Sequence, residues 1–252
     1  MEDKKFAILI DGDNTSPQYL KTIIDEVTKE GVITYKRIYG DWTVPNLDGW
    51  KDVLLEYSIT PMQQYAYTKG KNATDSAMII DAMDILYTGK VDGFCIVSSD
   101  SDFTKLASRL REAGMVVIGM GKHQTPKPFV SACSMFKYVD LISKPAATQK
   151  PKKGKPSAPS EQEKSTQTAL TDIKKAIDTM IEENADADGW LLASTVGTLL
   201  QKQFSDFDCR NFGFKKMIDL LKNMEYETKL SADKTTYYIS NKSARKDGKK
   251  QQ

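Results

Sequence analysis

The segment FAILIDGDN, residues 6–14, joins a run of five apolar residues directly to the acidic side chain of Asp11. The segment FCIVSSDSDF, residues 94–103, repeats this arrangement and reaches Asp100 after its own apolar run. A short, wholly apolar run is typical of a strand that is buried on both faces of a parallel sheet. We therefore predict two buried strands, each of which ends in a carboxylate.

The rest of the first 143 residues alternates apolar runs with amphipathic stretches. This alternation predicts an α/β fold, a Rossmann-like parallel sheet with helices on both faces, because each helix returns the chain to the same end of the sheet. Ligands of such sheets bind beyond the carboxyl ends of the strands, where the strand order reverses. The expected strands are 6–10, 33–39, 62–67, 94–98 and 115–120, and the expected helices are 19–27, 49–57, 75–86 and 103–114.

The acidic residues after two of these strands predict a metal site. Asp11 and Asp100 should project into one crevice if their strands are neighbours, and the expected helix from Asp75 adds a third carboxylate. Carboxylates brought close together repel one another unless a cation lies between them, and oxygen ligands suit Mg²⁺ or Mn²⁺. The alternative is that aspartates at these positions cap helices, since Asp75 and Asp102 both stand where an N-cap belongs.

Three segments of this region carry a resemblance to a known family: IDGDN (10–14), TKGKNATDSAMIIDAMDILYTGK (68–90) and CIVSSDSDFTKLASRLREAG (95–114). They resemble the NYN domain, a branch of the PIN-like ribonuclease superfamily, and the resemblance covers nearly all of residues 5–142. It implies a metal-dependent ribonuclease. The family often has glycine where Ser99 and Ser101 stand, which alters the shape of the loop and leaves the acids in place. The catalytic and metal-binding acids of the family correspond to Asp11, Asp75, Asp100 and Asp102, with Asn14 as a polar neighbour.

Other residues near these motifs have two interpretations each. Lys69 and Lys71 precede Asp75 closely enough to meet a phosphate of bound nucleic acid, or they lie in a solvated turn. We expect the helix residues Asp81 and Asp84 to face solvent or to line the wall of the crevice. His123 follows the fifth expected strand, and we expect it to be exposed in a loop.

The composition excludes several kinds of site and of location. The chain has one histidine, so it cannot form a His/His acid–base pair or a zinc site of several histidines. The three cysteines lack CxxC spacing and predict neither a disulfide framework nor a thiolate zinc site. The apolar run FAILI is too short for a signal peptide, and no run is long enough for a membrane span. We therefore expect a cytoplasmic protein with no membrane partner.

The charge divides the 252 residues into four parts. Residues 1–143 carry 16 basic and 19 acidic side chains, and residues 166–240 carry 9 and 12. Between them, residues 144–165 form a basic linker rich in proline and lysine, and residues 241–252 form a basic tail that we expect to be disordered. Basic segments of this kind attract a polyanion such as nucleic acid, or they merely increase solubility.

The part 166–240 has the pattern of a small winged-helix domain. An amphipathic helix at 168–183, a second helix from Trp190 and a terminal pair of short strands predict this outline. The stretches GWLL (189–192) and FDCRNFGFKKMIDLL (207–221) resemble the LOTUS domain, also called OST-HTH, a family linked to RNA binding and to docking of protein partners. Both kinds of partner stay open at this point.

Within this second domain, a few basic and aromatic side chains are candidates for RNA contacts. Arg210, Lys215 and Lys216 cluster near one expected helix and are candidate nucleic-acid-binding residues. Trp190, Phe212 and Phe214 could stack on bases, although aromatic residues at such spacings more often belong to the core. We expect these three rings to be part of the core.

The residues and the resemblances together predict a ribonuclease that hydrolyses RNA phosphodiesters through a carboxylate-bound divalent metal. One alternative is a non-catalytic RNA-binding adaptor that keeps the fold as a scaffold. Another is a phosphatase of the haloacid dehalogenase type, because DGDNT, residues 11–15, matches DxDxT and would make Asp11 a nucleophile. That chemistry needs a further acidic pair on a later strand, and the expected fifth strand ends in GKHQ instead.

Overall fold

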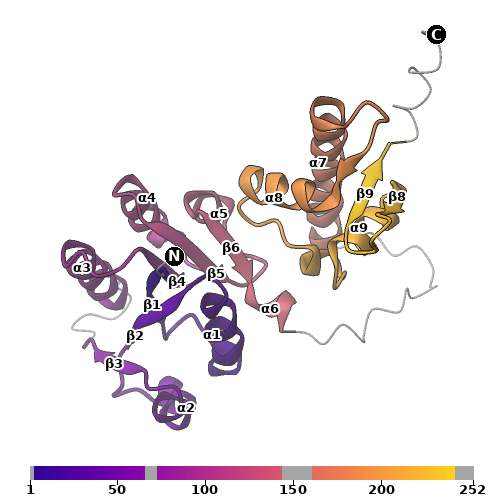
Figure 1. The fold of residues 1–252 in the computed structure, drawn as a ribbon. Coiled ribbons are helices and arrows are strands. Elements are labelled where there is room, and N and C mark those ends of the chain that lie inside the picture. Colours follow the sequence, from indigo (N-terminus) through magenta and orange to yellow (C-terminus); the bar gives the residue numbers. More distant parts are fainter. Residues whose placement is uncertain (1–2, 66–72, 144–160, 242–252) are drawn as a thin grey trace, which may run out of the picture. The chain divides into compact units, whose positions relative to one another are not determined.

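The structure is a computed structural model, and it describes residues 3–65, 73–143 and 161–241 (Figure 1). The chain divides into two compact units, Met1–Lys144 and Pro145–Gln252. Each unit has a core of its own, and each is described by itself.

The first unit contains a six-stranded sheet in which every neighbouring pair of strands is parallel. The strand order is β3-β2-β1-β4-β5-β6, so the order reverses between β1 and β4. This is the point at which ligands bind in sheets of this kind. The strands are β1 (Lys5–Asp11), β2 (Val32–Gly40), β3 (Thr60–Gln63), β4 (Gly93–Val97), β5 (Val116–Gly121) and β6 (Met135–Tyr138).

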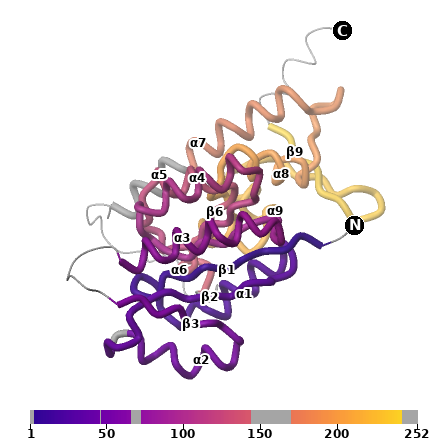
Figure 2. The backbone as a smooth tube through the Cα atoms, turned by 90° about the vertical axis from the view of Figure 1, so that its left-hand side faces the viewer, coloured from indigo at the N-terminus to yellow at the C-terminus, as the bar shows by residue number. Residues whose placement is uncertain are grey.

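Helices cover both faces of this sheet, as Figures 1 and 2 show. Helices α3, α4 and α5 pack with one set of strand residues, and α1, α2 and α6 pack with the alternate set. All five residues of β4 are buried, which explains why this strand reads as an unbroken apolar run. The predicted fold class is therefore confirmed. The helices are α1 (Leu20–Thr28), α2 (Lys51–Glu56), α3 (Ala73–Tyr87), α4 (Thr104–Glu112), α5 (Lys127–Ala132) and α6 (Val139–Ile142).

The sixth strand, β6, was not predicted, so the expectation of a five-stranded sheet is wrong. It has only the four residues MFKY and lies at the edge of the sheet, so the sequence shows no apolar run there. Its Lys137 ammonium lies 3.4 Å from the buried carboxylate of Glu26, which is on α1. The ion pair allows the charged residue Lys137 to be largely buried in a strand. A charged residue interrupts the apolar run by which a buried strand is predicted.

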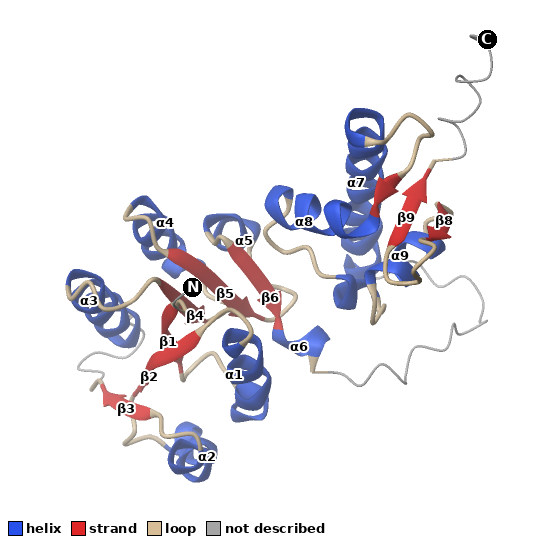
Figure 3. Cartoon of the chain, in the orientation of Figure 1, coloured by secondary structure: helices blue, strands red, loops and turns tan. Residues whose placement is uncertain are grey.

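The described residues of the second unit form three α-helices, a short 3-10 helix and a three-stranded antiparallel sheet in the order β7-β9-β8 (Figure 3). This arrangement confirms the predicted winged helix. Leu191 and Leu192, which we expected at the start of a helix, form instead the short strand β7, and Leu191 pairs with Ile239. Helix α7 begins at Glu161, within the segment predicted as linker. The elements are α7 (Glu161–Asn184), β7 (Leu191–Leu192), α8 (Ala193–Gln203), α9 (Met217–Asn223), β8 (Glu227–Leu230) and β9 (Tyr237–Ser240).

None of the helices within the described residues combines the length and the apolar character that a bilayer crossing requires.

Candidate metal centre

The candidate centre lies at the carboxyl ends of β1 and β4. These strands are parallel neighbours whose last paired residues are Ile10 and Val97, so the chain leaves the sheet at adjacent points. After β4 comes a short 3-10 helix, Ser101–Phe103, and the first turn of α3 lies over the same edge. Three acidic residues from these elements gather here. One carboxylate oxygen from each of Asp75, Asp100 and Asp102 lies within 4.8 Å of the others.

The mutual repulsion of these carboxylates contributes to a raised pKa of Asp75. Partial burial is the largest cause, and together with the negative charges of Asp11, Asp100 and Asp102 it raises the pKa of this carboxyl group to about 6. A cation placed among the oxygens would remove this repulsion. Hard oxygen donors in a half-exposed cluster fit Mg²⁺ or Mn²⁺, so the residues present suit the ion that the resemblance implies.

Asp11 lies beneath this cluster and is not one of its three members. Its side chain is only 1% exposed. The carboxylate accepts hydrogen bonds from the Ser98 hydroxyl at 2.7 Å and from the Asn14 amide nitrogen at 2.8 Å. Burial raises the pKa of Asp11, while the hydrogen bonds from Ser98 and Asn14 oppose that rise. The prediction that Asp11 and Asp100 meet at one edge agrees with the structure, and Asp11 acts on the cluster through its charge.

The helix-cap interpretation applies to a different residue from the two we expected. Asp75 lies inside the first turn of α3, and Asp102 lies inside the 3-10 helix, so neither is the N-cap. Asp100 is the N-cap of the 3-10 helix, because its Oδ1 accepts a 2.9 Å hydrogen bond from the backbone N–H of Asp102. The other oxygen of Asp100 makes no hydrogen bond within the described residues. Capping and membership of the acidic cluster are therefore compatible in this residue.

Ser98 is a site residue that the sequence analysis missed. Its hydroxyl donates to Asp11 and accepts the backbone N–H of Asp100 at 3.0 Å, so one buried oxygen connects both acidic loops. A second connection joins Asp13 to α3, since the Thr74 hydroxyl donates to the Asp13 carboxylate at 3.1 Å. The available signal was a serine at the end of a wholly apolar strand, where a polar side chain needs a buried partner.

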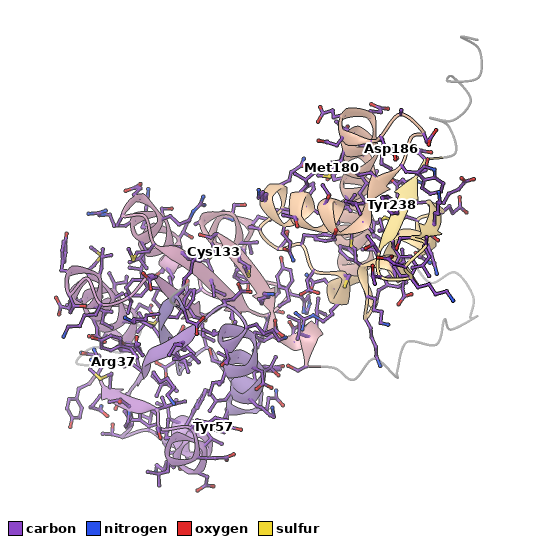
Figure 4. The ribbon with its side chains drawn as sticks, in the orientation of Figure 1. Arg37, Tyr57, Cys133, Met180, Asp186 and Tyr238 are labelled. Carbon is purple, nitrogen blue, oxygen red and sulfur yellow. The ribbon has the colours of Figure 1, made fainter. Side chains whose placement is uncertain are left out.

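Asp81 does not face solvent, which was one of its two expected placements, because this side chain is only 17% exposed and is paired. It accepts hydrogen bonds from the guanidinium of Arg37 and from the hydroxyl of Tyr39, both on β2. The contacts of Asp81 with Arg37, which is labelled in Figure 4, and with Tyr39 attach α3 to the sheet. They therefore help to hold Asp75 over the strand ends. Asp84, one turn further along, is exposed as expected.

His123 is half-buried rather than exposed, which corrects another expectation. Its backbone N–H donates to Asp140 Oδ1 at 2.9 Å, and its ring Nδ1 lies 2.5 Å from Asp140 Oδ2. Asp140 is in α6, directly after β6. The contact between His123 and Asp140 could not be predicted from the sequence, because the strand β6 that precedes Asp140 was not predicted.

The candidate nucleic-acid contacts have mixed outcomes. Lys69 and Lys71 lie outside the described residues. Arg210 is bound to Asp208 through its guanidinium at 2.6 Å, so its charge is already balanced. Lys215 and Lys216 are exposed.

The three aromatic candidates of the second unit have different outcomes. Phe212 and Phe214 pack against the core of the unit, as expected. The expectation that Trp190 belongs to the core is wrong, because this side chain is half-buried outside that cluster, and the Lys229 ammonium lies 5.7 Å from the centre of its ring. Tyr238, labelled in Figure 4, is the strand partner of Lys229 in the sheet.

Comparison with known proteins agrees with both resemblances. The NYN domain family matches residues 5–141, and the OST-HTH/LOTUS domain family matches residues 168–229. The second family indicates RNA binding, and the first indicates a PIN-like nuclease fold. No curated protein matches the sequence.

Solved structures add no argument about function. A protein of unknown function from Vibrio parahaemolyticus superposes with a TM-score of 0.45 at 20% identity, over 54% of this chain and 92% of that chain. MurG of Acinetobacter baumannii superposes with a TM-score of 0.37 at 13% identity, over 63% of this chain and 46% of that chain. The NYN match, by contrast, covers more than half of the sequence and includes every acid of the candidate centre. The chain belongs to the NYN domain family and carries an OST-HTH/LOTUS domain after its NYN domain.

Proposed function

We propose that this protein is a metal-dependent ribonuclease whose first unit hydrolyses RNA phosphodiesters and whose second unit binds the RNA. The observation that carries the proposal is the cluster of Asp75, Asp100 and Asp102, whose oxygens lie within 4.8 Å of one another at the strand-order reversal. Membership of a ribonuclease-like family supports the same chemistry, and the OST-HTH/LOTUS domain supports RNA as the substrate.

In the mechanism, Asp75, Asp100 and Asp102 are the residues that would hold Mg²⁺ or Mn²⁺. A divalent ion bound there would supply a water of lowered pKa and would stabilise negative charge on the phosphate. Asp75 must be deprotonated to bind a metal, and the buried charge of Asp11 favours a cation at this position. Asn14 and Ser98 keep the Asp11 carboxylate in one orientation through their hydrogen bonds.

No protein nucleophile is needed in this scheme, and the geometry disfavours the phosphatase alternative. A haloacid-dehalogenase-type reaction would require Asp11 to attack the substrate. Its carboxylate is 1% exposed and its oxygens already accept hydrogen bonds from Ser98 and Asn14. A nucleophile must reach the phosphorus atom, and a buried carboxylate whose two oxygens both accept hydrogen bonds is poorly placed to do so.

The decisive experiment measures cleavage of a labelled single-stranded RNA by the full chain with Mg²⁺ or Mn²⁺ and with EDTA. The variants are Asp100→Asn and the matched control Asp84→Asn, which removes the same charge from an exposed position of α3. We expect metal-dependent cleavage by the wild type and the control, and a loss of at least about a hundredfold in Asp100→Asn. Equal cleavage by all three preparations would reveal a contaminating nuclease and overturn the assignment. RNA binding without any cleavage would favour the adaptor function.

A further inference from the structure

The turn after β5, residues 122–125, lies beside the loop that carries Asp100. β4 and β5 are parallel neighbours, and Val97 pairs with Met120. Beyond this pair, the backbone N–H of Lys122 donates a 2.9 Å hydrogen bond to the hydroxyl of Ser99. The residue that precedes Asp100 is therefore bonded directly to Lys122.

Several hydrogen bonds hold this turn in one shape. The carbonyl oxygen of Lys122 accepts the backbone N–H of Thr125 at 2.9 Å and its hydroxyl at 2.6 Å. The backbone N–H of His123 is bound by Asp140 at 2.9 Å. The strand end packs tightly as well, because a Cβ at Gly121 would lie 2.6 Å from the carbonyl oxygen of Ser98. The backbone from which the Lys122 side chain extends is thus fixed before any ligand binds.

Within the described residues, the side chain of Lys122 is not engaged by a partner. Its side chain is half-buried and makes no ion pair or hydrogen bond within the described part of the chain. Some other basic residues of this unit do have such partners, as Arg37 has Asp81 and Lys29 has Glu26. A basic side chain on the turn next to the acidic loop is suited to a phosphate that approaches the acidic cluster.

We propose that Lys122 binds a backbone phosphate of the RNA, next to the phosphate that is cleaved. The RNA strand then runs from the acidic cluster across the carboxyl end of β5. Hydrogen bonds already hold the backbone of this turn, so little backbone conformational entropy is lost when the phosphate binds. This inference rests on the proposed function in one respect, which is that the substrate is RNA.

The test is a binding titration of the full chain with a fluorescent single-stranded RNA in EDTA, where a metal-dependent nuclease cannot cut. The variants are Lys122→Gln, Lys122→Arg and the matched control Lys90→Gln, which lies before β4 at the opposite edge of the sheet. Repulsion from the empty acidic cluster is the same in all of them. We expect Lys122→Gln to weaken binding about fivefold and to lower the salt slope by about 0.7, as for one lost phosphate contact with a single strand. Lys122→Arg and Lys90→Gln should bind like the wild type.

A second arm locates the contact by replacing single phosphates with neutral methylphosphonates. We expect one replacement to weaken wild-type binding and to have no further effect in Lys122→Gln, because both changes remove the same interaction. Two results would overturn the inference. One is equal RNA affinity of the wild type and Lys122→Gln. The other is that every methylphosphonate weakens binding by Lys122→Gln as much as it weakens binding by the wild type. Cleavage in Mg²⁺ is measured separately. A protein that does not cleave RNA, but in which Lys122→Gln cancels the effect of one methylphosphonate on binding, would refute only the nuclease function.

Discussion

The hydroxyl of Ser98 donates a 2.7 Å hydrogen bond to the carboxylate of Asp11, and both side chains are 1% exposed. Ser98 directly follows the central strand β4, and Asp11 is the last residue of the neighbouring strand β1. Their bond joins the two acidic loops beneath the cluster of Asp75, Asp100 and Asp102. The hydrogen-bonded pair Ser98 and Asp11 is therefore a buried frame beneath the cluster. The frame and the cluster can be tested separately.

The first prediction separates the two roles of Asp100. Asparagine keeps the acceptor that caps the 3-10 helix and removes the charge, whereas alanine removes both. In EDTA, Asp100→Asn should melt at the same temperature as the wild type or higher, because repulsion with Asp75 is relieved. Asp100→Ala should lose about 1 kcal/mol of cap stability. Thermal melts decide the matter, and a clearly destabilised Asp100→Asn would show that the acids do not repel.

The second prediction concerns pH and follows from the raised pKa of Asp75. Its folded value of about 6 exceeds the ordinary 3.8, so the folded protein holds this proton more tightly than the unfolded chain does. The contribution of Asp75 to the stability of the metal-free protein should fall as pH rises from about 4 to 6. Metal affinity should rise over the same range, because binding requires the carboxylate.

This pH effect can be measured as the increase in melting temperature that Mg²⁺ or Mn²⁺ causes at pH 5 and at pH 7. At a hundred times the dissociation constant the metal should stabilise the protein by roughly 2.7 kcal/mol. The increase should be larger at pH 7 in the wild type and in the control Asp84→Asn. An equal increase at both pH values, or one that survives in Asp75→Asn, would contradict a role for Asp75 as a ligand.

The third prediction tests the buried frame. Ser98→Ala leaves the Asp11 carboxylate buried with one donor fewer, and an unsatisfied buried group costs on the order of 1–3 kcal/mol. The control Ser101→Ala changes an exposed residue of the same loop and should stay within about 0.5 kcal/mol of the wild type. Urea unfolding at pH 7 measures both. If the two variants are equally stable, the Ser98–Asp11 bond contributes nothing.

The fourth prediction concerns the basic segments and the second unit. Removing residues 144–252 deletes eleven basic side chains from the linker and tail together with the OST-HTH/LOTUS domain. RNA affinity should fall and its salt dependence should flatten, because fewer counterions are released on binding. Metal-dependent cleavage should survive in residues 1–143, which contain a complete sheet and the acidic cluster. Identical affinity and salt slope in the two forms would assign the deleted part a different role.

The elements that the sequence predicted well are those whose pattern depends on local burial. β1 and β4 are buried on both faces, so their apolar runs were visible, and the amphipathic α1 and α4 each bury one side against the sheet. β6 was missed because its short, half-exposed segment contains Lys137, whose partner Glu26 lies on α1. A local window of sequence cannot show an ion pair between residues so far apart in the chain.

For the candidate site, the sequence by itself determined that Asp11 and Asp100 leave strand ends on the same edge of the sheet, because parallel strands place their carboxyl ends on one edge. The structure decided that these two strands are neighbours. The tertiary structure alone decided how the acids divide. Asp75, Asp100 and Asp102 gather at the surface of that edge, and Asp11 is buried beneath them. The same folding decided that Asp81 is paired with Arg37 and that Lys122 stands beside the Asp100 loop. Burial and pairing depend on side chains that arrive from distant segments, and only the packed chain brings those segments together.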